Sequence, residues 1–208
     1  MRFVQVLLLA SATVCGFASA QPGNFKRVQL PNQISLEIPS HWKILSQSTR
    51  DNLRAAGQAI TENAGVEGAS GRKESLLAVN AIPDPTGAMI RVSVTKPPEY
   101  SQADLAFATQ AELREVADEL LKGFKKMEAS GGPKVITVEP ARIEVWKTHR
   151  VLVLPYMRHS NVGPSPWRVT QYKIPFPDRL VEITLSYRES DSVVWRPILE
   201  KVKRSVSF

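Results

Sequence analysis

Cysteine is almost absent from this chain, which has one cysteine in 208 residues. That residue, Cys15, lies in an N-terminal stretch that we expect to be removed on export. The remaining 188 residues would then form no disulfide, and they would supply no thiol nucleophile and no cysteine ligand for zinc or an iron–sulfur cluster. The hydrophobic core must hold the fold together, and a domain of this length buries roughly 70% of the surface of its unfolded chain.

Sequence motifs for catalysis are also missing. The chain has no G-x-S-x-G nucleophile elbow, no phosphate-binding loop and no H-E-x-x-H pair. Of its three histidines, His149 and His159 could share a strand pair and bind a metal, but no aspartate or glutamate stands at recognisable ligand spacing from them. We therefore predict no catalytic, cofactor-binding or metal site, and we expect that the protein is not an enzyme.

The N-terminus has the only long apolar run. Arg2 precedes the apolar residues 4–17, and the small residues 18–20 follow. This order is typical of a secretory signal peptide, and the small residues predict cleavage between Ala20 and Gln21. We therefore expect an exported protein, either periplasmic or secreted.

Two alternatives to a cleaved leader are disfavoured. An uncleaved membrane anchor needs about 20 apolar residues, and the run is shorter. Lipidation of Cys15 is disfavoured because Val14 precedes it, where bacterial lipoprotein signals have a small residue. No other segment is apolar enough to span a membrane, so we expect no transmembrane segment in the mature chain.

Basic charge is concentrated in the C-terminal third. Residues 21–140 have 14 basic and 14 acidic side chains, whereas residues 141–208 have 12 basic and 6 acidic ones. Such asymmetry can mark a surface for an acidic protein or for anionic lipid, although a solvated, solubilising face is the favoured interpretation. Export and the lack of basic runs interleaved with aromatic residues argue against nucleic acid as a partner.

Apolar periodicity divides the mature chain into strands and helices. A helix from about Ser48 to Asn63 has a modest apolar stripe of Leu53, Ala56 and Ile60, which Gly57 weakens. A much stronger amphipathic pattern predicts one long helix over residues 101–129. Strands are expected at residues 26–30, 34–38, 76–82, 89–95, 135–138, 143–147, 151–157, 167–174 and 180–187, and a last helix begins near residue 190.

The order of these elements predicts an α+β fold. Strands that follow one another through short turns form an antiparallel sheet, and amphipathic helices must flank it to bury their apolar stripes. The chain has no internal repeat and no linker long enough to separate two domains. We predict a signal peptide at residues 1–20 and a single domain at residues 21–208.

Three stretches of this pattern resemble the PsbP-like fold. They are an N-terminal strand pair that leads into residues 38–42 (IPSHW), a hairpin, long helix and strand meander over residues 76–188, and a helix at residues 195–204 that runs into a terminal SVSF. The resemblance implies an α/β/α sandwich and a role in binding other proteins. The sequence departs from the family at residues 147–149, where a glycine is usual between two strands.

Two of the four tryptophans lie beside basic residues in predicted strands, and this combination is common at protein interfaces. We therefore consider a possible interaction face of Trp146, Lys147, Trp167, Arg168 and Lys173, although a core position is favoured for both tryptophans. The other two tryptophans are expected in the core.

The leading hypothesis is an exported, non-enzymatic protein-binding or accessory module of the cell envelope, whose partner is another envelope protein. The signal peptide, the lack of catalytic motifs and the PsbP-like resemblance motivate it. The alternatives are binding to an anionic membrane surface through the basic C-terminal third, and a hydrolase or ligand binder with an unrecognised site.

Overall fold

The computed structural model describes residues 24–66, 71–83, 86–160 and 163–208. The predicted leader and its cleavage site at Ala20 and Gln21 lie outside these residues and stay predictions. The strands are β1 (Phe25–Gln29), β2 (Ser35–Pro39), β3 (Lys43–Ile44), β4 (Arg72–Asn80), β5 (Ala88–Lys96), β6 (Val135–Val138), β7 (Arg142–Trp146), β8 (His149–Arg158), β9 (Trp167–Phe176) and β10 (Arg179–Arg188). The α-helices are α1 (Gln47–Asn63), α2 (Gln102–Phe107), α3 (Gln110–Glu128) and α4 (Ser192–Ser205).

An eight-stranded antiparallel sheet is the centre of the fold. Its strand order is β3-β4-β5-β10-β9-β8, and both β6 and β7 pair with β8 at its far edge. Strand β10 therefore lies between β5 and β9, although β5 is remote from it in sequence. Strands β1 and β2 form a separate two-stranded hairpin. This arrangement confirms the predicted α+β class with an antiparallel sheet.

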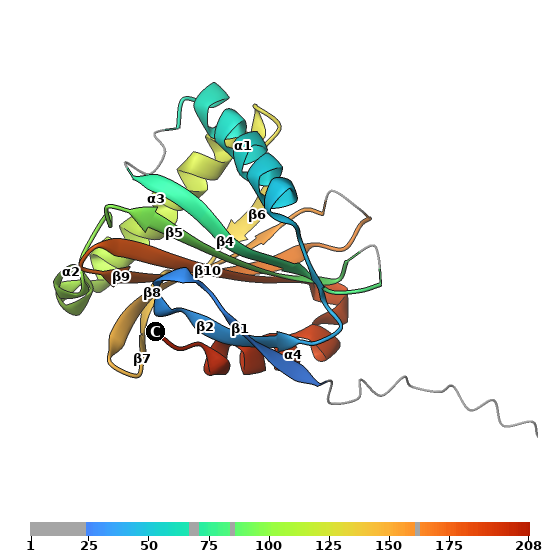
Figure 1. The fold of residues 1–208 in the computed structure, drawn as a ribbon. Helices are drawn as coiled ribbons and strands as arrows, with labels where there is room; N and C mark the ends of the chain where they lie inside the picture. Colours follow the sequence, from blue (N-terminus) through green and yellow to red (C-terminus); the bar gives the residue numbers. More distant parts are fainter. Residues whose placement is uncertain (1–23, 67–70, 84–85, 161–162) are drawn as a thin grey trace, which may run out of the picture.

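Helices cover both faces of the sheet (Figure 1). Helices α1, α2 and α3 lie over one face, and α4 lies with the β1–β2 hairpin against the other. The chain after α4 returns to the hairpin, because the amide of Ser35 donates to the carbonyl of Ser207 at 2.9 Å and the Ser207 amide donates back to Ser35 at the same distance. The amide of Glu37 donates to Oγ of Ser205 at 2.7 Å. These bonds join the N-terminal hairpin and the C-terminus into one layer.

The main core lies between the sheet and the α4 layer. On β10, Val181, Ile183 and Leu185 point into it, packed with α4 residues such as Leu199 and Val202. Successive side chains of a strand point to opposite faces, so Glu182, Thr184 and Ser186 of the same strand face α1 instead. The predicted alternation on this strand is therefore correct, and it leaves polar side chains on the α1 face.

The prediction of a single long helix over residues 101–129 is wrong in one respect. The chain forms two helices, α2 and α3, which are separated at Ala108 and Thr109. Thr109 accepts a hydrogen bond from the Glu112 amide, and Glu112 accepts one from the Thr109 amide, which forms a second capping box. Threonine side chains that bond to the local backbone compete with helix continuation, and that competition explains the break. Ser101 and Asp104 form the capping box at the start of α2.

Candidate functional site

The five residues of the predicted interaction face lie on both sides of the sheet. Trp146 contacts the ring of Tyr172, with 4.9 Å between centroids, and lies near α4. Arg168 faces α4 as well, since it lines a small cleft there with residues of that helix. Trp167 and Lys173 lie on the same strand as Arg168 but point to the opposite face. Lys147 is exposed in the β7–β8 turn, where its φ is 56°. The structure therefore does not gather these five side chains into one surface.

The tryptophans and Arg168 have structural partners. Trp42 is buried and packs edge-on against Trp195, with 5.8 Å between ring centroids, which agrees with the core positions expected for both. Trp167 is buried, and its indole donates to Oγ of Ser160 at 3.2 Å. Arg168 forms ion pairs with Glu139 and Glu189. Burial alone would lower the pKa of Arg168, but the hydrogen bonds to these two carboxylates outweigh it and raise the pKa.

The histidines do not come together. His149 begins β8 and packs against Phe176 and Phe208, whereas His159 follows the last residue of the same strand. At about 3.3 Å per residue, ten residues of strand place them roughly 30 Å apart, too far to share a metal ion. Within the described ranges, no group of three or more histidine, cysteine, aspartate or glutamate side chains is placed to hold a metal.

Carboxylates neutralise part of the basic C-terminal third. Among its described residues, six basic side chains have a carboxylate partner within 4 Å: Arg142, Arg168, Lys173, Arg179, Arg188 and Lys203. Helix α4 also has the exposed basic residues Arg196, Lys201 and Arg204. In the described part of the chain, no helix has the length and apolar character needed to cross a bilayer.

Helix α1 is the unusual element of the structure. None of its 17 residues is buried, and Leu53, the first residue of its predicted apolar stripe, is 53% exposed. The helix is held mainly near its ends: Nη1 of Arg50 donates to the carbonyl of Leu45 at 2.9 Å, and Oγ1 of Thr61 contacts Sδ of Met127 at 3.8 Å. Helix α1 therefore stands over the sheet without packing tightly against it.

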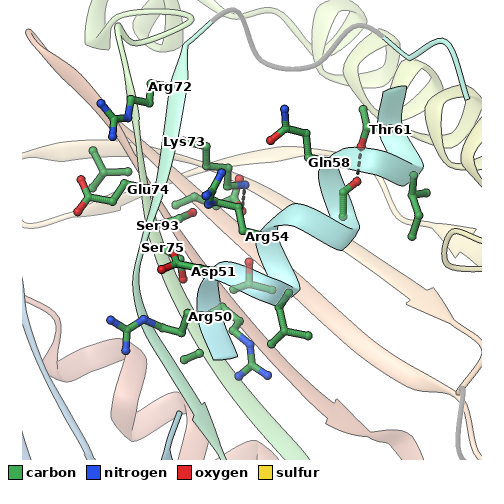
Figure 2. Close-up of a pocket in the computed structure, with 18 of the residues that line it drawn as sticks. Arg50, Asp51, Arg54, Gln58, Thr61, Arg72, Lys73, Glu74, Ser75 and Ser93 are labelled. Carbon is green, nitrogen blue, oxygen red and sulfur yellow. Dashed lines mark hydrogen bonds and ion pairs between the residues drawn. The ribbon is translucent and has the colours of Figure 1, made fainter. Parts of the chain in front are cut away.

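A groove with a volume of about 1690 Å³ separates α1 from the sheet (Figure 2). Its floor comes from β4, β5 and β10, where the small side chains of Ser75, Ala78, Ser93 and Thr184 point toward α1. These residues alternate with core residues of the same strands, so their orientation is fixed by the burial of their neighbours. Small, mostly polar side chains on the floor give a helix little apolar surface to bury, and space remains beneath α1.

Charged side chains line this groove. Four basic and three acidic side chains lie on the α1 face: Arg50, Arg54, Lys73 and Arg91, and Asp51, Glu62 and Glu182. Arg72, Glu74 and Lys96 also border the groove, but they occupy the alternate positions of β4 and β5, whose side chains point to the opposite face, and Nζ of Lys96 donates to Oδ1 of Asn32 in the hairpin at 3.4 Å. Glu182, on the floor, lies 3.0 Å from Nζ of Lys73 and 3.8 Å from Nζ of Lys173. Burial alone would raise the pKa of Glu182, but the two lysines outweigh it and lower the pKa.

Arg91 is the most enclosed cation in the groove. Its guanidinium donates to the carbonyls of Val79 and Ile90, both at 2.9 Å, and to Oδ1 of Asn80 at 2.8 Å. All three acceptors are neutral, and among the described residues no carboxylate lies within 4 Å of this side chain. Burial lowers the pKa of Arg91 to about 10, so the group is still charged at neutral pH. The floor of the groove therefore has a positive charge that the described part of the chain does not directly neutralise.

The local sequence pattern does not predict this groove. The apolar stripe of α1 suggests a helix that packs on the sheet, and the polar positions of β10 suggest an ordinary second face of a strand. The available signals are Gly57, which weakens the helix, and the polar run of Glu182, Thr184 and Ser186 opposite a buried face. Neither signal shows that the two elements face each other, because that depends on the strand order.

Comparisons with known proteins agree with this architecture. No family model matches the chain, and no curated protein matches it. The chain is similar to the solution structure of the cyanobacterial PsbP (CyanoP) of Synechocystis, with 16% identity over 96% of this chain and 98% of that chain and a TM-score of 0.52. It is also similar to the crystal structure of LpqN from Mycobacterium tuberculosis, a protein involved in cell envelope biogenesis, with 10% identity over 88% of this chain and 90% of that chain and a TM-score of 0.48. The chain has the PsbP-like fold that its order of elements predicted.

Proposed function

We propose that this chain is a non-catalytic binding module of the cell envelope, and that it recognises another envelope protein through the groove beneath α1. The observation that carries the proposal is the helix itself: none of the 17 residues of α1 is buried, although the helix covers a groove of about 1690 Å³. A helix gains most of its stability in a protein from packing an apolar face. A long helix that leaves its apolar residues accessible is therefore a candidate contact surface for a second molecule.

The size of the groove supports a protein partner. Small-molecule sites usually have volumes of about 300–1000 Å³, and this groove is larger. The groove also combines aliphatic side chains such as Leu53 and Ile60 with arginines, and arginine is enriched at protein interfaces. The leader-like N-terminus is the basis for placing the module in the envelope.

A photo-crosslinking amino acid at Gln58 tests this proposal. Gln58 is exposed on α1 and lines the groove (Figure 2). The matched control is the same amino acid at Arg204, exposed on α4 on the other side of the sheet. In intact envelopes of the source cell, we expect one discrete protein adduct from position 58 and none from position 204. Equal adducts from the two positions, or none from position 58, would contradict the proposal.

A further inference from the structure

We infer that the occupant of the groove is a short, extended, acidic segment of the partner protein. This inference rests on the proposed function and adds the chemistry that the groove recognises. Three features of the described residues lead to it: the arginines that have no carboxylate partner, the length of the groove, and the apolar side chains along its roof.

Unpaired cations outnumber unpaired carboxylates on the α1 face of the groove. Glu182 is paired with Lys73 and Lys173. Asp51 and Glu62 accept hydrogen bonds from the neutral amides of Gln47 and Gln58, at 3.1–3.2 Å and 2.8 Å, and the described residues place no basic group within 4 Å of either. Arg50, Arg54 and Arg91 have no carboxylate within 4 Å among the described residues, so three unpaired cations compare with two unpaired carboxylates.

The unpaired cations of the groove are arginines. Arg54 is exposed, and Nε of Arg50 is buried with no acceptor in the described part of the chain. Arg50 and Arg54 lie one turn apart on α1 (Figure 2), and Arg91 lies on the floor of the groove. Guanidinium groups without a carboxylate partner are complementary to the carboxylates of a bound chain.

The length of the groove fits a segment of about eight residues. Helix α1 has 17 residues, which at about 1.5 Å per residue gives a roof of roughly 25 Å. An extended chain advances about 3.3 Å per residue, so about seven or eight residues span this length. A single carboxylate or phosphate group would reach one or two of the arginines and leave the others without a partner.

Apolar side chains on the roof define the remaining chemistry. Leu53 and Ile60 of α1 line the groove together with Met127 of α3. Methionine adapts its shape to different partners, and exposed leucine gains from burial on binding. The segment that fits best therefore combines acidic residues, which pair with the arginines, with aliphatic residues, which pack against Leu53 and Ile60.

Binding of synthetic octapeptides to the chain from residue 21 onwards tests this inference. One fluorescent peptide alternates glutamate with leucine, and a second alternates lysine with leucine. We expect the glutamate peptide to bind at least roughly tenfold more tightly, and its affinity to fall as salt rises from about 0.05 to 0.5 M, because salt screens exposed charges. The double variant Arg50→Glu and Arg54→Glu should weaken binding by at least roughly tenfold.

The control variant changes the same charge elsewhere on the surface. Arg196→Glu and Arg204→Glu alter two exposed arginines on α4, on the other side of the sheet, and should leave the affinity unchanged. Melting temperatures of both double variants show whether either one has lost its fold. The inference is overturned if the lysine peptide binds equally well, if the α4 variant loses as much affinity as the groove variant, or if citrate at equal charge displaces the glutamate peptide completely.

The peptide-binding experiment and the crosslinking experiment can fail independently of each other. A specific adduct from position 58 together with no preference for the glutamate peptide would retain the binding module and reject an acidic partner. A clear preference for the glutamate peptide without any adduct in the envelope would retain the chemistry of the groove and reject recognition of an envelope protein.

Discussion

Replacing Glu182 by glutamine tests how the polar face of the sheet is stabilised. Its carboxylate lies 3.0 Å from Lys73 Nζ and 3.8 Å from Lys173 Nζ, and its side chain is 14% exposed. Glu182→Gln keeps the size of the side chain and leaves two ammonium groups without a carboxylate. A hydrogen bond to a charged group contributes about 1.5–3 kcal/mol, and the partial exposure of Lys73 reduces the effect. We expect the variant to lose about 2 kcal/mol of unfolding free energy at neutral pH.

The loss should depend on pH in a defined direction. Burial alone would raise the pKa of Glu182, but the lysines outweigh it and the folded state lowers the pKa. A carboxyl group whose pKa is lowered by folding stabilises the protein above its unfolded pKa of about 4.3, and the stabilisation is lost as the pH falls through the lowered folded pKa. Urea unfolding at neutral pH and in steps below about pH 4 measures this difference. The two proteins should converge in stability toward the acid end.

An exposed ion pair gives the matched control. Glu37 lies 3.1 Å from Nη2 of Arg27, and the two side chains are 33% and 43% exposed. Exposed pairs contribute about 0–1 kcal/mol, so Glu37→Gln should change the unfolding free energy by less than half as much as Glu182→Gln. Equal losses from the two variants, or a loss at Glu182 that persists unchanged in acid, would refute the assignment of the stabilisation to this buried pair.

Four further substitutions test how the helices are packed and capped. In Gly87→Ala, the new Cβ would lie 2.6 Å from Nε1 of Trp195, so the indole must shift; we expect a loss of about 1–3 kcal/mol and a changed near-ultraviolet circular dichroism spectrum. Leu53→Ala on α1 should lower the unfolding free energy by less than about 1 kcal/mol, whereas Leu199→Ala on α4 should lower it by about 2–5 kcal/mol, both measured by urea unfolding. Equal losses would show that α1 packs as tightly as α4. Thr109→Ala removes the cap of α3 and should lower the unfolding free energy by about 1 kcal/mol, and an unchanged value would show that the cap does not stabilise this helix.

The sequence is sufficient to predict most strands because their signal is local. Val181, Ile183 and Leu185 alternate with polar residues, and burial of one face requires that alternation in any sheet. The break between α2 and α3 could not be predicted in the same way, because the apolar repeat continues through it. The new helix begins where Thr109 and Glu112 form a capping box. The strand β3 could not be predicted either, because a segment of two residues is too short to show an alternation of polar and apolar residues.

The interaction face shows a different limit. Trp167 and Arg168 suggest one surface because they are adjacent in the sequence and combine an aromatic ring with a positive charge. Adjacent residues of a strand nevertheless point to opposite faces, and the predicted strand at residues 167–174 contains both. The alternation rule therefore separates the two residues on sequence grounds alone. Grouping by sequence distance fails wherever the period of the element decides which side chains meet.

The groove depends on information that no local pattern contains. Its floor combines β4 and β5 with β10, which begins 83 residues after the end of β5, at Arg179 compared with Lys96. A polar face on each strand would suggest no cavity, and a weak helix alone would suggest only a poorly packed surface. The groove arises because the antiparallel pairing of β10 with β5 places three polar faces side by side and α1 passes over them. Since small polar residues on the floor cannot anchor the helix, the residues that weaken its packing also create the space that a partner can fill.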